Sequence, residues 1–196
     1  MRAGNKGQLR IIGGRYRGRR LSIPAQPGLR PTADRVRETL FNWLQPVILG
    51  SRCLDLFAGS GALGFEAASR GADEVLMIDR SEPVTQVLAA SARSLGAAQV
   101  RVRRADALHW LAGSGGPFDL VFLDPPFHKD LLAPSCTLLS SRGWLAPGAL
   151  VYLEVPASRA LPSLPTGWTL IRDKRAGQVR FALAAVEPQK CNGPEG

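Results

Sequence analysis

The sequence is poor in the residues that build disulfide frameworks and metal sites. It contains three cysteines and two histidines among 196 residues, and no two cysteines have CxxC spacing. An odd number of cysteines without this spacing argues against both a disulfide framework and a zinc site. We therefore expect no bound metal.

Long apolar runs are also missing. No stretch approaches the roughly 18 uninterrupted apolar residues of a membrane-spanning helix, and the N-terminus lacks the apolar region of a signal peptide. Hydrophobic residues nevertheless make up 45% of the chain, enough for the core of one good-sized domain. These features predict a cytoplasmic protein with no membrane partner. Nothing in them indicates an obligate dimer, so we expect a monomer.

Acidic residues are absent from the first 33 positions. This segment carries eight of the 25 basic residues, whereas the other 163 residues carry 17 basic and 16 acidic side chains. The net charge of +9 is therefore concentrated at the N-terminus. Such a segment can bind a phosphate backbone, although the charges alone are equally compatible with a solvated tail. Tyr16 and the strand-like residues 9–12 and 19–23 favour an ordered basic β-hairpin.

Helical and strand-like patterns alternate after the hairpin. Apolar residues at helical spacing between 36 and 47 follow the helix-start signals Thr32 and Asp34. Strand-like runs occur at 52–57, 74–79, 100–105, 118–123 and 149–155, and an antiparallel pair follows at 168–172 and 178–185. This alternation predicts an α/β fold, with a mostly parallel seven-stranded sheet and helices on both faces. We expect a hairpin-and-helix unit at 1–48, a larger domain at 49–186 and a disordered tail at 187–196.

A glycine-rich turn, DLFAGSGALG at 55–64, joins a predicted strand to a predicted helix. Gly59, Gly61 and Gly64 satisfy GxGxxG, a pattern that allows a tight turn and close approach of a ligand to the backbone. A dinucleotide-binding fold has the same pattern, but Asp55 within the strand would repel a pyrophosphate. The ammonium group of a cofactor that contains an amino acid would favour a carboxylate there. A turn without any ligand is the remaining alternative.

Two more carboxylates follow predicted strands. Asp79 ends the second strand and Asp106 follows the third, and sheets of this kind bind ligands outside the carboxyl ends of their strands. Asp79 can accept hydrogen bonds from both hydroxyls of a ribose, and Asp106 can reach an adenine amino group. Each residue can also be explained as a helix cap, an explanation that is strongest for Asp106.

The tetrapeptide Asp124-Pro125-Pro126-Phe127 follows a buried strand at the same edge of the sheet. The exocyclic amine of a base is a poor nucleophile because its lone pair is delocalised into the ring. A carboxylate and a backbone carbonyl that accept its hydrogen bonds can hold the nitrogen toward sp³ geometry. The prolines fix the backbone and remove competing N–H donors, and Phe127 offers a face for an extruded base, worth about 1–3 kcal/mol. Alone, this tetrapeptide is also compatible with a Pro-Pro turn that ends a strand.

Taken together, these features resemble the bacterial small-subunit (16S) rRNA guanine-N2 methyltransferases, a family of class I, Rossmann-like methyltransferases. The similarity extends from about Leu9 to Leu183. Its distinctive stretches are RIIGGRYRGRRL (10–21), LRPTADRVRETLFNWL (29–44), CLDLFAGSGALGFEA (53–67), FDLVFLDPPF (118–127) and AGQVRFAL (176–183). Many amino-methyltransferases share the glycine and DPPF motifs, and the N-terminal stretches narrow the resemblance to this family.

The resemblance implies methyl transfer from S-adenosyl-L-methionine to N2 of one guanosine, leaving S-adenosyl-L-homocysteine. The partner would be 16S rRNA in the small ribosomal subunit or its assembly intermediate. The cofactor's methionine end would contact Asp55, Phe57, Gly59, Ser60 and Gly61, its ribose Asp79, and its adenine Asp106 and Ala107. Residues 124–127 would hold the target base. The family pattern also leads us to expect a second acid at Met77, whose absence leaves Asp79 as the only ribose carboxylate on that strand.

The N-terminal unit would dock the rRNA and cap the cofactor. Thr32 and Arg35 match the family's N-terminal helix, which caps the cofactor and faces the substrate. The side chains expected to contact the rRNA backbone are Arg10, Arg15, Arg17, Arg19, Arg20, Arg35 and Arg37.

Other functions stay open at this point. An adenine-N6 or cytosine-N4 methyltransferase acting on DNA or RNA has DPPF-like motifs too. The compact chain, without a DNA-reading domain, and the N-terminal resemblance disfavour action on DNA. A non-catalytic RNA-binding assembly factor on the same fold is disfavoured because the site residues are intact. A nicotinamide-dependent oxidoreductase is disfavoured by Asp55.

Overall fold

The computed structural model describes residues 7–23, 34–127 and 129–187. A two-stranded hairpin, β1 (Gln8–Arg10) and β2 (Arg20–Ser22), precedes the main sheet. The strands of that sheet are β3 (Arg52–Asp55), β4 (Glu74–Asp79), β5 (Val100–Arg104), β6 (Phe118–Leu123), β7 (Leu145–Pro156), β8 (Trp168–Ala176) and β9 (Val179–Val186). The helices are α1 (Asp34–Leu44), α2 (Ala62–Ser69), α3 (Glu82–Leu95), α4 (Ala107–Leu111) and α5 (Leu132–Ser141).

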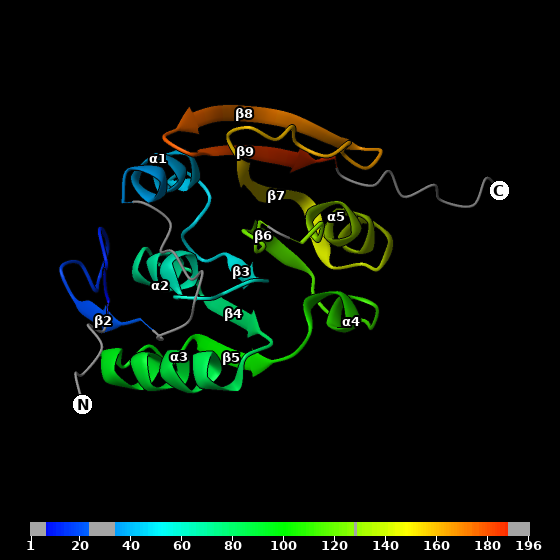
Figure 1. Cartoon of the computed structure of the whole chain (residues 1–196). Coiled ribbons are helices and arrows are strands. Elements are labelled where there is room, and N and C mark those ends of the chain that lie inside the picture. Colours follow the sequence, from blue (N-terminus) through cyan, green and yellow to red (C-terminus); the bar gives the residue numbers. More distant parts are fainter. Residues whose placement is uncertain (1–6, 24–33, 128, 188–196) are drawn as a thin grey trace.

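The main sheet has seven strands in the order β5-β4-β3-β6-β7-β9-β8. Strands β3 to β7 are parallel, and β9 is antiparallel to both of its neighbours. Helices α1, α2 and α3 lie on one face of the sheet, and α4 and α5 lie on the other (Figure 1). The predicted fold, a mostly parallel, Rossmann-like α/β sheet covered on both faces, is therefore confirmed. Among the described residues, no helix is long and apolar enough to cross a membrane.

The direction in which successive strands are added to the sheet reverses after β5. From β3 the chain adds β4 and β5 on one side, and β6 and β7 then follow on the other. Sheets of this type bind ligands at such a switch point, outside the carboxyl ends of the strands. The topology thus places the segments after β3 and β6, which carry Asp55 and Asp124, beside the expected ligand site.

Two strand boundaries differ from the sequence prediction by more than two residues. β7 begins at residue 145 rather than 149, and β8 extends to 176 rather than 172. The extension of β8 has the sequence Asp173-Lys174-Arg175-Ala176, which lacks the apolar alternation expected of a strand. It is nevertheless paired with β9 as far as Ala176↔Val179, because the backbone ladder does not require apolar side chains.

The basic hairpin packs on α2 through a close backbone approach at its turn. Gly14 has a φ of +73°, and a Cβ atom there would lie 1.8 Å from the carbonyl oxygen of Ser69. The amide of Arg15 donates to that carbonyl, and the amide of Tyr16 donates to the Ser69 hydroxyl. Only glycine fits this contact. Leu9, Tyr16 and other apolar hairpin side chains belong to the same core cluster as α1, α2 and α3.

A buried ion pair reinforces this docking. The Glu66 carboxylate of α2 accepts the backbone N–H groups of Ile12 and Gly13 at 2.9 and 2.8 Å. The Arg37 guanidinium of α1 lies 3.6 Å from Glu66 and donates to the carbonyl oxygen of Arg10. Both charged side chains are 0% exposed. One carboxylate therefore connects the hairpin, α1 and α2.

The position of Arg37 corrects one prediction. Arg37 was expected to contact an RNA backbone, but its side chain is fully buried and is also paired with Asp34 at 2.6 Å. Its guanidinium cannot reach a phosphate while the hairpin is docked. Arg37 is part of the internal framework of the protein.

We expect Glu66→Gln to lower the free energy of unfolding by about 3–5 kcal/mol, because it removes the only buried carboxylate described beside Arg37 and one of the acceptors of the hairpin amides. Denaturant unfolding followed by circular dichroism would measure this loss. Glu38→Gln, at an exposed position of α1, is the matched control and should change stability by less than about 0.5 kcal/mol. Equal effects of the two substitutions would contradict the role given to Glu66.

Candidate active site

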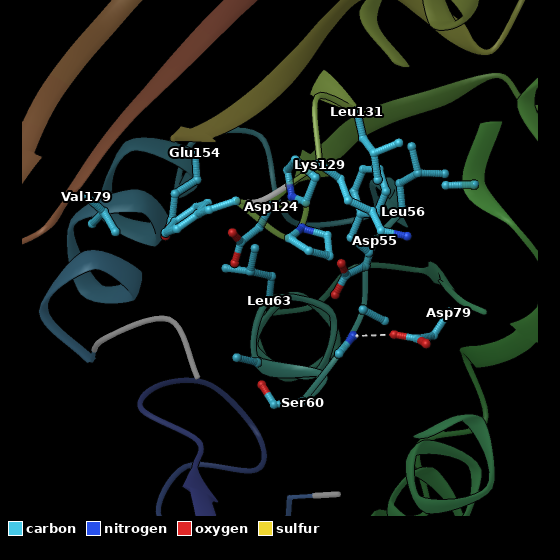
Figure 2. A pocket seen from close by; sticks show the side chains of 18 of the residues that line it. Asp55, Leu56, Ser60, Leu63, Asp79, Asp124, Lys129, Leu131, Glu154 and Val179 are labelled. Atoms are coloured by element: carbon cyan, nitrogen blue, oxygen red, sulfur yellow. Dashed lines mark hydrogen bonds between the residues drawn. The ribbon is translucent and has the colours of Figure 1, made fainter. Parts of the chain in front are cut away.

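A cavity of about 1050 Å³ opens at the carboxyl ends of the parallel strands. Its walls are the glycine turn after β3, the ends of β4 and β5, residues 124–127 after β6, Glu154 of β7 and the β8–β9 turn. Figure 2 shows these side chains around the start of α2. The cavity therefore lies at the switch point of the sheet, where this topology positions a ligand.

The structure brings most of the predicted cofactor and base residues into this cavity. Gly61 lies directly behind the wall and precedes α2, and a Cβ atom there would be 2.6 Å from the Phe65 ring. Thr32 lies outside the described residues. The predicted residues that line the cavity are Asp55, Phe57, Gly59, Ser60, Asp79, Asp106, Ala107, Asp124, Pro125, Pro126 and Phe127.

Asp55 is a buried carboxyl group that also faces the cavity. Its Oδ2 atom accepts the backbone N–H of Gly64 at 3.0 Å, in the first turn of α2. Burial raises the pKa of Asp55 to about 7, and the nearby carboxylates of Asp124 and Asp79 add to the rise. A cation beside Asp55 would oppose both effects and favour its ionised form.

Met77 lies behind this part of the wall, where the family pattern had led us to expect a second acid that contacts the ribose. The Met77 side chain is fully buried, and its Cε atom would be 2.4 Å from a Cβ atom on Gly64. Gly64 therefore allows α2 to pack closely on β4, a known role of the third glycine in this motif. Because Met77 does not line the cavity, an acid at this position would not have added a ribose contact here.

Asp79 and Asp106 both have local structural roles. The Asp79 carboxylate accepts the backbone N–H groups of Gly59 at 3.1 Å (Figure 2) and Ser81 at 2.8 Å. The Asp106 carboxylate caps α4 by accepting the N–H of His109 at 3.1 Å, which confirms the helix-cap explanation. A carboxylate has about four acceptor positions, so both groups keep acceptor capacity toward the cavity.

The DPPF segment follows β6 beside a buried acid that the sequence reasoning missed. The pairing of Leu123 with Leu153 brings the next residues on the two strands, Asp124 and Glu154, side by side. Glu154 is 4% exposed and lines the cavity. Its signal in the sequence is a single acid within the apolar run of β7, but only the sheet order places it next to Asp124.

The environment of Glu154 disfavours its charge. Burial raises the pKa of this carboxyl to about 8, the Asp124 carboxylate contributes further, and a hydrogen bond from Tyr152 opposes the rise. The Tyr152 hydroxyl donates to Glu154 Oε2 at 2.5 Å. Pro125 is buried, whereas Phe127 is 38% exposed at the cavity wall. The cavity thus combines acceptor groups for an amine with an accessible aromatic face.

The remaining predicted RNA-contacting side chains are exposed, but some lie away from the cavity. The backbone of Arg15 contacts Ser69 at the end of α2, and the Arg19 guanidinium donates to the carbonyl of Ser94 near the end of α3. Both helices begin beside the cavity and extend about 12 and 21 Å from it. The exposed arginines of this group are Arg10, Arg15, Arg17, Arg19, Arg20 and Arg35.

Among the described residues, no group of three or more His, Cys, Asp or Glu side chains is arranged to hold a metal ion.

Comparisons with known proteins support the resemblance found in the sequence. The family model described as "Conserved hypothetical protein 95" matches residues 9–185. The chain is 51% identical over 183 residues to "Ribosomal RNA small subunit methyltransferase D" of Escherichia coli (strain K12), covering 93% of this chain and 92% of that protein. The protein of the same name from Haemophilus influenzae is 44% identical, covering 91% of this chain and 94% of that protein.

A solved structure agrees with these matches. The "putative methyltransferase yhhF" of Escherichia coli superposes with a TM-score of 0.88 at 48% identity, covering 93% of this chain and 100% of that chain. The family resemblance is thereby confirmed. The chain belongs to the conserved hypothetical protein 95 family and, within it, to the group of the ribosomal RNA small subunit methyltransferase D proteins.

Proposed function

We propose that this protein transfers a methyl group from S-adenosyl-L-methionine to N2 of one guanosine of 16S rRNA, in the small ribosomal subunit or its assembly intermediate. The observation that carries the proposal is the juxtaposition of the DPPF segment with the carboxyl groups of Asp55, Asp79 and Asp106 in one cavity. The relatives named for small-subunit rRNA methylation support the RNA substrate. The choice of N2 of guanine rests on the resemblance of the motifs.

The residues of the cavity fit this cofactor. Gly59 presents bare backbone at the cavity wall. Gly61 lies behind it and allows the tight turn into α2, because a side chain there would collide with Phe65. Asp55 would pair with the ammonium group, Asp79 with the ribose hydroxyls, and Asp106 with the adenine amino group. When bound, the cofactor supplies an electrophilic methyl group on a sulfonium.

The DPPF segment would activate the target amine. Asp124 and the Pro125 carbonyl would accept hydrogen bonds from its N–H groups, which keeps the nitrogen lone pair out of the ring and directed at the methyl group. Phe127 would stack on the extruded base. The nitrogen–methyl bond would form as the sulfur–methyl bond breaks, and the extra amine proton would leave to Asp124 or to water. Catalysis would come mainly from positioning and electrostatics.

The exposed arginines would hold the RNA backbone. Because Arg15 and Arg19 contact the far ends of α2 and α3, a ligand that reaches both them and the cavity must be longer than one nucleotide. This distance favours a polynucleotide over a free nucleoside. Electrostatic contacts of this kind weaken as salt concentration rises.

The decisive assay uses purified protein, labelled S-adenosyl-L-methionine and assembled or partly assembled small subunits that lack the modification. After nuclease digestion, we expect the label in N2-methylguanosine. Label in N6-methyladenosine or N4-methylcytidine would keep the methyltransferase class and overturn the base assignment. Absence of both label and cofactor binding would favour a non-catalytic assembly factor.

The binding of S-adenosyl-L-homocysteine should depend on pH through Asp55. Its raised pKa of about 7 means that the ionised carboxylate, which the ammonium group requires, becomes more populated as the pH rises. Affinity should therefore increase between about pH 6 and about pH 7.5, below the range in which an α-ammonium group loses its proton. Calorimetric titration at several pH values would measure it.

Asp55→Asn should bind more weakly and lose this pH dependence. Glu154→Gln serves as the matched control, because Glu154 is the other cavity acid with a raised pKa, and it should retain the dependence. A pH-independent affinity of the unsubstituted protein would remove Asp55 from the ammonium site.

Asp124→Asn should reduce kcat by roughly 100-fold or more, because the amide replaces an acceptor that the amine needs. Binding of S-adenosyl-L-homocysteine should change little. Asp130→Asn is the matched control: this residue is nearby in the sequence, and its side chain is 95% exposed. Near-full activity of Asp124→Asn with intact cofactor binding would show that the carboxylate has another role.

A further inference from the structure

Glu154 is a buried acid in the cavity that the proposed chemistry does not use. It lies in β7 between Leu153 and Val155, both of which are buried in the core on the opposite face of the sheet. Within the described part of the chain, no ion pair involves Glu154, in contrast to the buried Glu66. An apolar residue of similar size would be easier to bury at such a position. The acid is therefore poorly explained by folding alone.

Glu154 and Asp124 present their carboxyl groups on the same side of the sheet. Phe122 of β6 and Tyr152 of β7 are paired and pack in the core beneath α1, and the side chains two residues further along each strand point the same way. Adjacent strands lie about 4.8 Å apart. Figure 2 shows the two acids next to each other on the cavity wall.

Tyr152 fixes one oxygen of Glu154 as an acceptor and opposes the protonation that burial favours. Its hydroxyl donates to Oε2, and its ring is fixed by Phe122 and Phe181, whose centroids lie 6.5 and 6.4 Å away. One Glu154 oxygen is thus occupied by a rigid donor. Because Glu154 itself lines the cavity, its remaining acceptor capacity is available to a ligand there. An N–H donor at the other oxygen would favour the ionised carboxylate in the same way.

The three amino-bearing bases differ in the group next to the amine. Guanine carries an N1–H donor beside its N2 amine, whereas adenine has the N1 acceptor beside its N6 amine and cytosine has the N3 acceptor beside its N4 amine. Two adjacent carboxylates match two adjacent donors. The same pair would oppose the acceptor of adenine or cytosine, which leaves buried polar groups unpaired and so discriminates strongly.

We propose that Glu154 determines the base by accepting a hydrogen bond from N1–H of the target guanine while Asp124 holds its N2 amine. This inference rests on the proposed function and extends it, because the DPPF segment alone does not distinguish among the three bases. Tyr152 is then a positioning residue that acts through Glu154.

The test compares guanosine with 2-aminopurine riboside at the target position of the rRNA in rebuilt small subunits. The analogue keeps the N2 amine but has an N1 acceptor in place of N1–H. The unsubstituted protein should prefer guanosine in kcat/KM by about 5- to 150-fold, the range supplied by a well-formed pair of hydrogen bonds to a base edge. The loss of O6 in the analogue affects every variant and cancels when their preferences are compared.

Glu154→Gln is the informative substitution, because its amide can donate to the N1 acceptor and it removes a buried charge without changing the shape of the side chain. It should reduce the preference for guanosine at least about fivefold and leave binding of S-adenosyl-L-homocysteine intact. Tyr152→Phe, which retains the packed ring, should reduce the preference in the same direction by a smaller factor. Thr137→Ala, at an exposed position of α5, is the control and should leave it unchanged.

The outcomes distinguish a failure of the role given to Glu154 from a failure of the proposed function. Methylation of guanosine N2 with the same preference in Glu154→Gln as in the unsubstituted protein would overturn the role of Glu154 and leave the proposed function standing. Methylation of adenosine or cytidine by the unsubstituted protein would overturn both.

Discussion

The contact between the Glu66 carboxylate and the Arg37 guanidinium is the internal constraint on which the N-terminal half of the molecule depends. Glu66 also accepts two backbone N–H groups of the hairpin turn, so a single buried charge fixes the hairpin, α1 and α2 together. α2 in turn begins at the glycine turn of the cavity and supplies the Gly64 amide to Asp55. α2 therefore links the position of the arginine-rich hairpin to the cavity. Such a network is stable only while both charges are paired, because an isolated buried charge is strongly destabilising.

The carboxyl groups that line the cavity disfavour one another's ionised forms. Asp55 and Glu154 are both buried, and each is raised in pKa by its burial and by the charge of Asp124. At these two groups the folded protein therefore binds more protons than the unfolded chain between about pH 4 and about pH 8, and the stability that they contribute decreases as the pH rises through this range. A ligand with an ammonium group near Asp55 and N–H donors near Asp124 and Glu154 would relieve this repulsion. Sites of this kind sacrifice stability of the free protein for recognition of a ligand.

Much of the fold was predictable from local pattern. The alternation of apolar runs predicted all seven strands of the main sheet, with β4 and β6 at their observed bounds, because strands buried on both faces read as continuous apolar runs. The extension of β8 was not predictable, since its polar sequence is held by the backbone ladder of β9 and by the Asp173–Arg180 ion pair rather than by apolar packing. In the site, the glycine turn, Asp79 and the DPPF segment were identified because each follows a strand at the carboxyl edge. Arg37 was misassigned because a sequence pattern shows which residues are charged but not which of them are paired inside.

The sequence by itself determined the class of sheet, the motifs at the carboxyl ends of the strands and the family. These follow from short stretches of sequence and their spacing, which do not depend on how the side chains pack. The tertiary structure alone decided which groups meet. Glu154 is 30 positions from Asp124 in the chain and becomes its neighbour only through the parallel pairing of β6 and β7. In the same way, Glu66 meets the hairpin 53 positions away only when α2 packs beside it. Contacts between residues distant in sequence are set by strand order and helix docking, and no local pattern contains that information.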